Sequence, residues 1–315
     1  MTKFFPKRAE PLVTAKSDSL WEKACEVIPG GCQTFSKMPY QHVSGVSPKL
    51  LSRGSGCRSW DVDGNEYIDY MMSLGPNILG YADENINKAA FEGSKLGVVS
   101  SLGHPLETKL AEKLVSIIPC AEMVRFGKNG SDVTSAAIRA ARSFTGRDKI
   151  LVCGYHGWHD WYIGSTSRNL GVPKEVQNLT VDFKYNDIDS LKNAFKNYPG
   201  EIAAVIMEPV NFIEPEDGFL EEVKLIAHEN NALLIFDEVI TGFRMNIGGA
   251  QKHFNVTPDL ACFGKAMGNG YPMCALAGKA EIMNVFEEAF FSGTFAAELV
   301  SISASIATIN AIEER

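Results

Sequence analysis

The sequence has no surplus of basic residues: 30 Lys and Arg stand against 38 Asp and Glu, and the formal net charge is −8. Nucleic-acid-binding proteins usually carry a basic excess, so we expect no nucleic-acid partner. Long hydrophobic runs are missing too, since no window reaches the roughly 18 apolar residues of a membrane-spanning helix, and we expect no membrane partner. The N-terminus lacks the apolar segment of a secretory signal.

Cysteine patterns typical of metal sites and disulfide frameworks are also missing. The seven cysteines are scattered and odd in number, and no two are spaced as CxxC. This usage indicates free thiols in a reducing compartment, so we predict a cytoplasmic protein. Because 45% of the 315 residues are hydrophobic, disordered and collagen-like proteins are excluded. The length allows about two domains.

The first seventy residues differ in sequence pattern from the rest, and we predict a separate N-terminal segment over residues 1–70. Residues 17–28 have an amphipathic pattern that starts at a Ser/Asp cap and stops before Pro29-Gly30-Gly31, which predicts a helix. Further along, Asp63-Gly64 stands between apolar residues and predicts the turn of a β-hairpin.

From about residue 120, short apolar runs alternate with helix-like segments. The runs are 122–126, 150–153, 203–207, 233–236, 260–263 and 274–277, and the helix-like segments are 131–145, 187–197 and 219–230. Runs that are apolar on both faces predict buried strands, and their alternation with helices predicts an α/β fold with a mostly parallel sheet covered by helices. Such sheets bind ligands at the carboxyl ends of their strands, so the residues after each run are the candidates for chemistry.

A glycine-rich turn, Gly-Lys-Asn-Gly-Ser-Asp at 127–132, follows the first run and opens a helix. Backbone N–H groups and the helix dipole converge near Gly130 and Ser131, which suits a phosphate. The turn is neither a Walker P-loop nor a G-x-G-x-x-G fingerprint. An equally simple interpretation is that Ser131 and Asp132 only cap the helix, and the sequence leaves both open.

Aromatic residues follow the second run, where residues 155–159 read Tyr-His-Gly-Trp-His. On a loop at the sheet edge, an aromatic side chain such as Tyr155 can stack on a planar ligand. The two histidines lack the spacing of a zinc site, so we expect no metal and favour a structural role for His159.

Charged side chains close three other runs. Glu208 and Asp237 each follow an apolar run, and a carboxylate there needs a cationic partner. For Asp237 that partner is either a ligand or Arg244 in a structural salt bridge. Lys265 follows a run inside a Gly-rich loop, where burial can hold an amine partly neutral and nucleophilic. Taken alone, this lysine is more simply an ordinary turn residue.

These features have one joint explanation. A phosphate cradle, a stacking aromatic, a strand-end aspartate and a strand-end lysine are the parts that hold pyridoxal phosphate (PLP). The aspartate pairs with the protonated pyridine nitrogen, the lysine carries the cofactor as an aldimine, and the helix N-terminus holds the phosphate.

The sequence resembles the class III aminotransferases, which are PLP-dependent enzymes of fold type I. Within that family it is most similar to the glutamate-1-semialdehyde 2,1-aminomutases, and the resemblance runs from about residue 20 to the end. The matching stretches are residues 61–69, 75–80, 129–132, 155–157, 236–244, 264–270 and 292–295.

The resemblance implies a role for each matching residue at the cofactor ring. Lys265 would carry the cofactor and shuttle the proton, and Asp237 would bind the pyridine nitrogen. Val239 would cover one ring face and Tyr155 the other.

It also implies how the phosphate is held. Gly130 and Ser131 would bind it, Glu208 would help to order the site, and Thr294 would reach the phosphate of a neighbouring subunit. The family shares its active sites across a homodimer.

The implied activity is PLP-dependent transfer of an amino group from a small-molecule donor to a carbonyl acceptor, as in an aminotransferase or aminomutase. Two alternatives are a PLP-binding fragment without full turnover and another PLP reaction such as racemisation.

Two departures from the family pattern bear on these expectations. The aminomutases carry Pro-Gly-Gly-Val-Asn-Ser-Pro-Val-Arg, whose arginine meets the substrate carboxylate, whereas residues 29–37 read Pro-Gly-Gly-Cys-Gln-Thr-Phe-Ser-Lys. Lys37 keeps the charge but loses the bidentate fork, which leaves room for a keto-sugar or a keto acid. Thr34 and Lys37 are candidate substrate contacts, although Lys37 could also be a solvated loop lysine.

The second departure is at the other end. An apolar pattern over 296–315 predicts a long helix, which in the family leads into a C-terminal small domain that is absent here. We therefore expect residues 71–315 to form the PLP-binding large domain. A fragment, a truncated chain or a split gene would each explain the absence.

Overall fold

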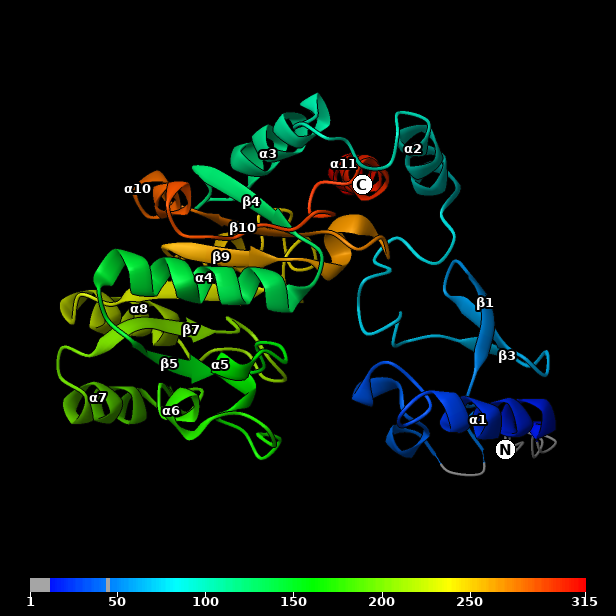
Figure 1. The fold of residues 1–315 in the computed structure, drawn as a ribbon, viewed down its shortest axis with the longest axis horizontal. Helices are drawn as coiled ribbons and strands as arrows, with labels where there is room; N and C mark the ends of the chain where they lie inside the picture. The colour runs from blue at the N-terminus through cyan, green and yellow to red at the C-terminus, as the bar shows by residue number, and fades with distance from the viewer. Residues whose placement is uncertain (1–11, 44–45) are drawn as a thin grey trace, which may run out of the picture. The chain divides into compact units, whose positions relative to one another are not determined.

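The computed structural model describes residues 12–43 and 46–315, and the chain divides into two compact units (Figure 1). The first unit ends at Leu74 and also takes in Leu79–Asp83. The second comprises Gly75–Ile78 and Glu84–Arg315.

The first unit combines one helix with a three-stranded antiparallel sheet, in the order β1-β2-β3. Its elements are α1 (Ala15–Val27), η1 (Phe35–Lys37), η2 (Pro39–Gln41), β1 (Leu51–Ser55), β2 (Arg58–Asp61) and β3 (Glu66–Ile68). The predicted hairpin is confirmed as β2 and β3, with Gly64 in the turn at a φ of +94° that favours glycine.

The predicted helix start at a Ser/Asp cap is wrong by one turn. Thr14 occupies the N-cap position, and Ser17 lies inside the first turn of α1. Ser17 is buried, and its hydroxyl oxygen accepts hydrogen bonds from the backbone N–H groups of Lys49 and Leu50, at 3.0 and 3.1 Å. This serine therefore holds the approach to β1, while the N–H groups of Lys16 and Ser17 at the helix end donate to the Asp63 carboxylate, at 2.9 and 2.8 Å.

The second unit is built on a seven-stranded sheet in the order β4-β10-β9-β8-β7-β5-β6. The strands are β4 (Met123–Gly127), β5 (Lys149–Cys153), β6 (Thr180–Asp182), β7 (Ile202–Met207), β8 (Leu233–Glu238), β9 (Leu260–Phe263) and β10 (Cys274–Gly278). In this sheet β10 runs opposite to the other six strands, so the predicted mostly parallel sheet is confirmed. All six apolar runs form strands, and β6 was not predicted.

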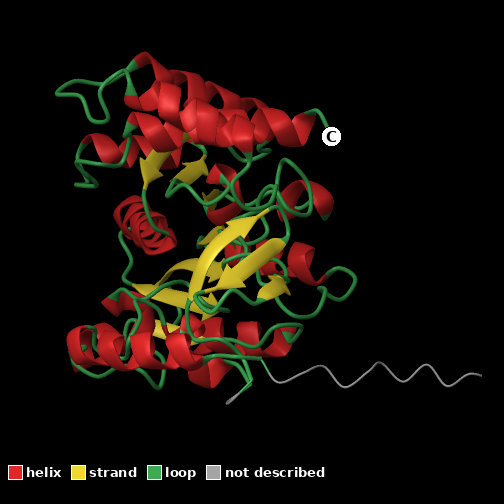
Figure 2. Cartoon of the chain, turned by 90° about the vertical axis from the view of Figure 1, so that its right-hand side faces the viewer, coloured by secondary structure: helices red, strands yellow, loops and turns green. Residues whose placement is uncertain are grey.

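Helices cover both faces of this sheet (Figures 1 and 2). The longer ones are α2 (Glu84–Ser94), α3 (Pro105–Ile117), α4 (Gly130–Thr145), α7 (Ile188–Asn197), α8 (Phe219–Glu229) and α11 (Leu299–Glu313). The shorter ones are α5 (Asp160–Ile163), α6 (Lys174–Gln177), α9 (Ala250–His253), α10 (Ala280–Met283), η3 (Lys265–Gly268) and η4 (Asn284–Glu287). The predicted helices are confirmed as α4, α7, α8 and α11, while α2 and α3 were not predicted.

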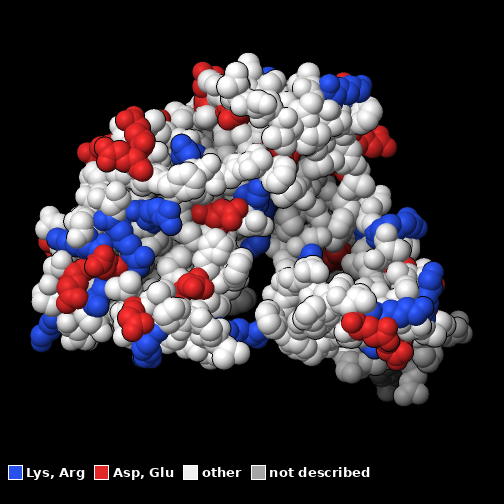
Figure 3. Space-filling model, in the orientation of Figure 1, with Lys and Arg blue, Asp and Glu red and all other residues white. Residues whose placement is uncertain are grey.

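Two hydrophobic clusters form the core of this unit. The larger joins the sheet to α3, α7, α8 and α11, and the smaller joins it to α4 and α10. Five of the seven strands are buried almost throughout, but β4 lies at the sheet edge and Met123 is 41% exposed, so the prediction that every run is buried on both faces is wrong for β4. Acidic and basic side chains are interspersed over the face of this unit seen in Figure 3.

Candidate active site

The sheet topology brings the predicted residues to one edge. Strands β4, β5, β7, β8 and β9 all run in the same direction, because β10 is antiparallel to both β4 and β9. Their carboxyl ends therefore meet along one edge, which is where the first turn of α4, the 155–159 loop, Glu208, Asp237 and Lys265 are found.

Asp237 has a buried histidine as its partner. The Nδ1 atom of His156 lies 2.9 Å from Asp237 Oδ2, and the other carboxylate oxygen accepts the N–H of Val239 at 3.1 Å. The expected alternative, a salt bridge to Arg244, is wrong. The guanidinium of Arg244 instead donates to two backbone carbonyl oxygens, those of Gly75 and Ile240.

The sequence did not single out His156, although two signals pointed to it. Asp237 requires a cationic or donor partner, and His156 stands on a loop at the same sheet edge. Its ring stacks at 6.4 Å on Trp161 and meets Tyr162 edge-on at 5.3 Å. Its Nε2 atom is buried and has no hydrogen-bond partner among the described residues.

Glu208 orders the aromatic loop through the backbone. Its Oε2 accepts hydrogen bonds from the N–H of Tyr155 at 3.1 Å and from Asn211 Nδ2 at 2.9 Å. Burial raises the pKa of Glu208, and the Tyr155 N–H opposes that rise. The Tyr155 side chain is 60% exposed and stands edge-on to Tyr162 at 5.7 Å, so one face of its ring is open to a ligand.

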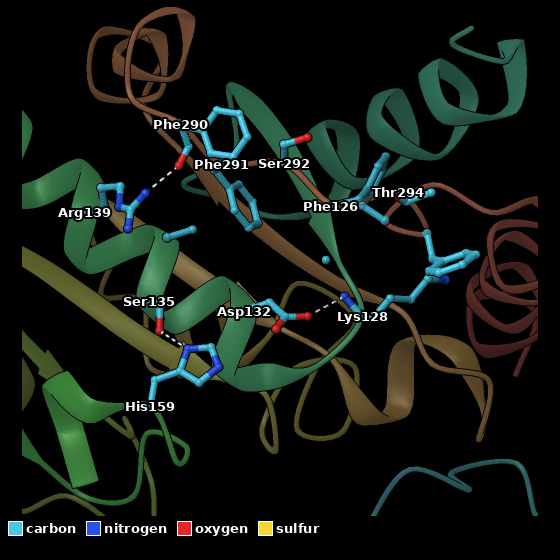
Figure 4. A pocket seen from close by; sticks show the side chains of 15 residues that line it. Phe126, Lys128, Asp132, Ser135, Arg139, His159, Phe290, Phe291, Ser292 and Thr294 are labelled. Carbon is cyan, nitrogen blue, oxygen red and sulfur yellow. Dashed lines mark hydrogen bonds between the residues drawn. The ribbon is translucent and has the colours of Figure 1, made fainter. Parts of the chain in front are cut away.

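The first turn of α4 is held by side-chain hydrogen bonds to backbone N–H groups. Asp132 Oδ2 accepts the N–H groups of Lys128 and Asn129, at 3.0 and 2.8 Å, and so closes a capping box (Figure 4). The Ser131 hydroxyl accepts the N–H of Trp158 at 3.2 Å. The simpler interpretation is therefore confirmed for Asp132, which caps the helix, whereas the Ser131 hydroxyl bonds to the 155–159 loop and takes no part in the capping box.

Several glycines let these segments approach closely. At Gly157, where φ is +106°, a Cβ atom would collide with the Ser131 side chain. A Cβ at Gly130 would lie 3.2 Å from Val239 Cγ1, and one at Gly264 would lie 3.4 Å from the same atom. The Val239 side chain therefore stands between the first turn of α4 and the turn that carries Lys265.

Lys265 begins η3 in a strained conformation, with a φ of +33° that non-glycine residues rarely adopt. Burial lowers its pKa, while the carboxylates of Asp237 and Glu208 raise it, and the net shift is downward. The amine is therefore neutral more often than an exposed lysine, as a nucleophile or base requires.

The remaining predicted residues lie elsewhere. Thr294 is exposed and lines a cavity of about 440 Å³ between β4, α4 and residues 290–296 (Figure 4). Thr34 and Lys37 belong to the first unit, where Lys37 is exposed at the end of η1 and the Thr34 carbonyl accepts the Cys32 thiol at 3.2 Å. His159 has the structural role expected of it, since its Nδ1 lies 2.7 Å from Ser135 Oγ.

Two general expectations concern metals and membranes. Among the described residues, no three His, Cys, Asp or Glu side chains gather where they could hold a metal ion. Within the same residues, no helix has the length and apolar character needed to cross a membrane.

The geometry fits a phosphorylated pyridine aldehyde. A glycine-lined helix N-terminus suits the phosphate, since a Cβ at Gly157 would fill the space beside Ser131. The buried Asp237 suits a protonated ring nitrogen, and the amine of Lys265 suits an aldehyde. These groups come from the ends of four strands, β4, β5, β8 and β9, along one edge of the sheet.

Comparison with known proteins identifies the family. Residues 40–315 match the family model described as Aminotransferase class-III. The 3-aminobutyryl-CoA aminotransferase of Cloacimonas acidaminovorans is 44% identical over 97% of this chain and 75% of its own. The glutamate-1-semialdehyde 2,1-aminomutase of Desulforamulus reducens is 37% identical over 95% of this chain and 73% of its own.

Two solved structures support the same conclusion. The FumI protein of Sphingopyxis sp. MTA144, solved in its PLP internal aldimine form, is 34% identical with a TM-score of 0.89, covering 96% of this chain and 73% of that one. An omega-transaminase from Sphaerobacter thermophilus is 31% identical with a TM-score of 0.85, covering 94% and 72%. The chain therefore belongs to the class III aminotransferase family, and it is an enzyme that transfers amino groups with PLP as its cofactor.

Proposed function

We propose that the chain moves an amino group between two molecules, from a donor with its amino group on the β-carbon of an acyl chain to a keto acid. The intermolecular part rests on Lys37, which by the resemblance described above takes the place of the substrate-binding arginine of the aminomutases. A lysine cannot reproduce the bidentate contact that arginine makes with a carboxylate.

The β-amino donor is supported by the names of two relatives. One is the 3-aminobutyryl-CoA aminotransferase, at 44% identity. The other is the structure of a β-phenylalanine aminotransferase from Variovorax paradoxus, 27% identical with a TM-score of 0.83. Both names describe a substrate whose amino group is one carbon further from the acyl carbon than in an α-amino acid.

In this proposal, the residues of the sheet edge divide the work of holding the cofactor. Gly130 and Ser131 hold the phosphate through the first turn of α4, while Tyr155 and Val239 cover the two ring faces. Asp237 keeps the ring nitrogen protonated. When bound, PLP supplies an electron sink beside the carbon that bears the substrate's amino group.

Lys265 and Glu208 complete the assignment. Lys265 Nζ would hold the cofactor through its aldehyde and, when free, would act as the base that accepts a proton from the substrate carbon bearing the amino group. The downward shift of its pKa supports both tasks, because each needs the neutral amine. Glu208 fixes the backbone of Tyr155 and so sets where the aromatic ring lies.

We extend the proposal to a homodimer in the cytoplasm. The exposure of Thr294 supports a contact with the phosphate bound to a second subunit. Seven free cysteines, four of them buried, support a reducing compartment. Sedimentation velocity of the purified chain tests the dimer, and a monomer at micromolar concentration would exclude it.

The substrate is tested by half-reactions. Single amines are added to the PLP-loaded protein, and the absorbance of the bound cofactor is followed without an acceptor. We expect 3-aminobutyryl-CoA or a simpler β-amino acid to discharge the absorbance, and α-amino acids to act more slowly. Lys265→Ala should not respond. A response to α-amino acids alone would exclude the β-amino donor.

The aminomutase remains the second candidate, because relatives at 37 to 43% identity carry that name. Incubation with glutamate-1-semialdehyde and no second substrate distinguishes the two. Conversion to the amino-shifted isomer would establish the aminomutase and overturn intermolecular transfer.

A further inference from the structure

A partly buried ion pair ties the first turn of α4 to the segment that carries Thr294. Lys128 Nζ donates to Glu298 Oε1 at 2.8 Å and to the carbonyl oxygen of Pro272 at 3.0 Å. The side chains of the ion pair are only 18% and 11% exposed, so water screens their attraction weakly. Three segments that are distant in sequence therefore meet at one ammonium group.

The backbone of Lys128 is fixed as firmly as its side chain. Its N–H donates to Asp132 Oδ2 at 3.0 Å, the same oxygen that accepts the N–H of Asn129. Its carbonyl oxygen accepts the Cys274 thiol at 3.5 Å. Lys128 is thus held both at its ammonium group and at its backbone, immediately before the turn that leads to Gly130.

Glu298 is equally constrained. It caps α11 by accepting the N–H groups of Val300 and Ser301, at 2.8 and 3.0 Å. Burial alone would raise its pKa, but the hydrogen bonds from Lys128 and Ser301 outweigh that effect and hold the pKa below its ordinary value. The carboxylate is therefore charged at neutral pH and available to Lys128.

The segment before Glu298 is anchored at its other end as well. Arg139 donates from Nη1 to the carbonyl oxygen of Phe290 at 2.6 Å, and Arg125 donates to that of Phe291. Along the chain, Thr294 lies between these anchors and Glu298; Figure 4 shows Arg139, Phe290 and Thr294. The segment is held at one end by residues of β4 and α4 and at the other by Lys128, which lies in the turn between these two elements.

We propose that Lys128 and Glu298 are a positioning pair for the cofactor's phosphate. They set the first turn of α4 and the Thr294 segment in one arrangement, and neither side chain contacts the phosphate itself. Because Glu298 already pairs with the ammonium group of Lys128, the first turn of α4 binds the phosphate with N–H groups and hydroxyls. The inference rests on the proposed function, since it takes Gly130 and Ser131 as the phosphate site.

The test compares two ligands that differ only in the phosphate. Dissociation constants of the apoprotein for PLP and for pyridoxal are measured by quenching of tryptophan fluorescence. We expect Lys128→Met to weaken PLP binding about tenfold and to leave pyridoxal binding unchanged. Lys128→Arg keeps the charge and should retain most of the preference for PLP. Lys113→Met is the matched control, because it breaks the Lys113–Glu313 ion pair at the far end of α11.

Each outcome is decisive. Equal weakening of both ligands would mean that the pair only supports the fold, and unchanged PLP binding would mean that it does nothing for the phosphate; either overturns the inference. If Lys128→Met does not fold, Glu298→Gln, which keeps an acceptor oxygen for the cap of α11, is measured in its place. A wild-type protein with no preference for PLP over pyridoxal would instead overturn the proposed phosphate site.

Discussion

The Nδ1 atom of His156 lies 2.9 Å from Oδ2 of Asp237, and both side chains are buried. The other ring nitrogen of His156 has no partner among the described residues. A proton on that nitrogen would be buried without an acceptor, so the neutral ring carries its proton on Nδ1 and donates it to the carboxylate. Asp237 is thereby oriented while its negative charge stays available to a ligand.

Replacing His156 should weaken cofactor binding. His156→Leu removes a hydrogen bond to a charged group, which is worth about 2 kcal/mol, so we expect the apoprotein's affinity for PLP to fall by more than tenfold. His156→Gln can still donate an N–H and should lose less. Fluorescence titration with PLP measures both.

The matched control is another histidine–aspartate pair. His228 Nε2 lies 2.8 Å from Asp259 Oδ2, and Asp259 also accepts the N–H of Leu234 near the amino end of β8. His228→Leu should leave the affinity for PLP unchanged. If both histidine variants weaken binding equally, the effect of His156 is a general loss of stability and not an effect on Asp237.

Closing the space beside Ser131 should block the phosphate. Gly157→Ala adds a Cβ atom that would collide with the Ser131 side chain, and it also strains a residue at a φ of +106°. We expect at least a tenfold loss of affinity for PLP and a small loss of stability, of about 1 kcal/mol from the strain.

Gly171→Ala separates the two effects. Gly171 has a similar φ of +87°, but no atom lies within 4 Å of the position that a Cβ would take there. This variant should lose stability to the same extent and keep its affinity for PLP. Equal affinity losses in both variants would show that backbone strain alone, and not crowding of Ser131, is responsible.

The pH dependence of cofactor capture follows from the pKa of Lys265. Burial lowers that pKa below the ordinary 10.5, despite the opposing charge of Asp237. The neutral amine is the reactive form, so its fraction rises with pH and reaches its maximum at a lower pH than in a free lysine. Stopped-flow capture of PLP by the apoprotein should level off below pH 10.5.

A blocked lysine in solution is the control for titration of PLP itself. Its rate with PLP should keep rising to about its own pKa, near 10.4. If the protein and the blocked lysine show the same midpoint, Lys265 is not held in a neutralising environment. Lys265→Ala should show no capture at any pH.

The sequence predicted most of this edge of the sheet because apolar runs define strands and the residues after them stand at the strand ends. Asp237 and Lys265 were found in this way. By contrast, β6 has only three residues, Thr180–Asp182, and Asp182 at its end is exposed, so no apolar run marks it. Helices α2 and α3 begin outside the region of alternating runs, and their amphipathic patterns were not singled out.

Pairs that join distant residues could not be predicted from local patterns. His156 and Asp237 are 81 positions apart, and Lys128 and Glu298 are 170 apart. The chemistry of Asp237 required some donor or cation, and Arg244 was nearer in sequence. Only the register of β5, β7 and β8 decides that the loop after β5, and not the turn after β8, supplies it.

The amino edge of the sheet offers a prediction about stability alone. Asp259 is buried and accepts hydrogen bonds from Lys279 Nζ at 2.6 Å, from His228 Nε2 at 2.8 Å and from the N–H of Leu234 at 2.8 Å. Asp259→Asn removes the charge that holds these groups together. We expect the free energy of unfolding to fall by about 2 kcal/mol at pH 7, seen as a lower Tm.

The pH dependence of that loss identifies its cause. Burial alone would raise the pKa of Asp259, but the hydrogen bonds from Lys279, Leu234 and His228 outweigh it and hold the pKa below its ordinary 3.8. The stabilisation is therefore complete above pH 3.8 and is lost as the pH falls through the lower, folded value. The Tm difference between wild type and Asp259→Asn should shrink over that acidic range. A difference that persists there would assign the loss to packing, and Glu92→Gln, which breaks the exposed Lys95–Glu92 pair, should change the Tm at neither pH.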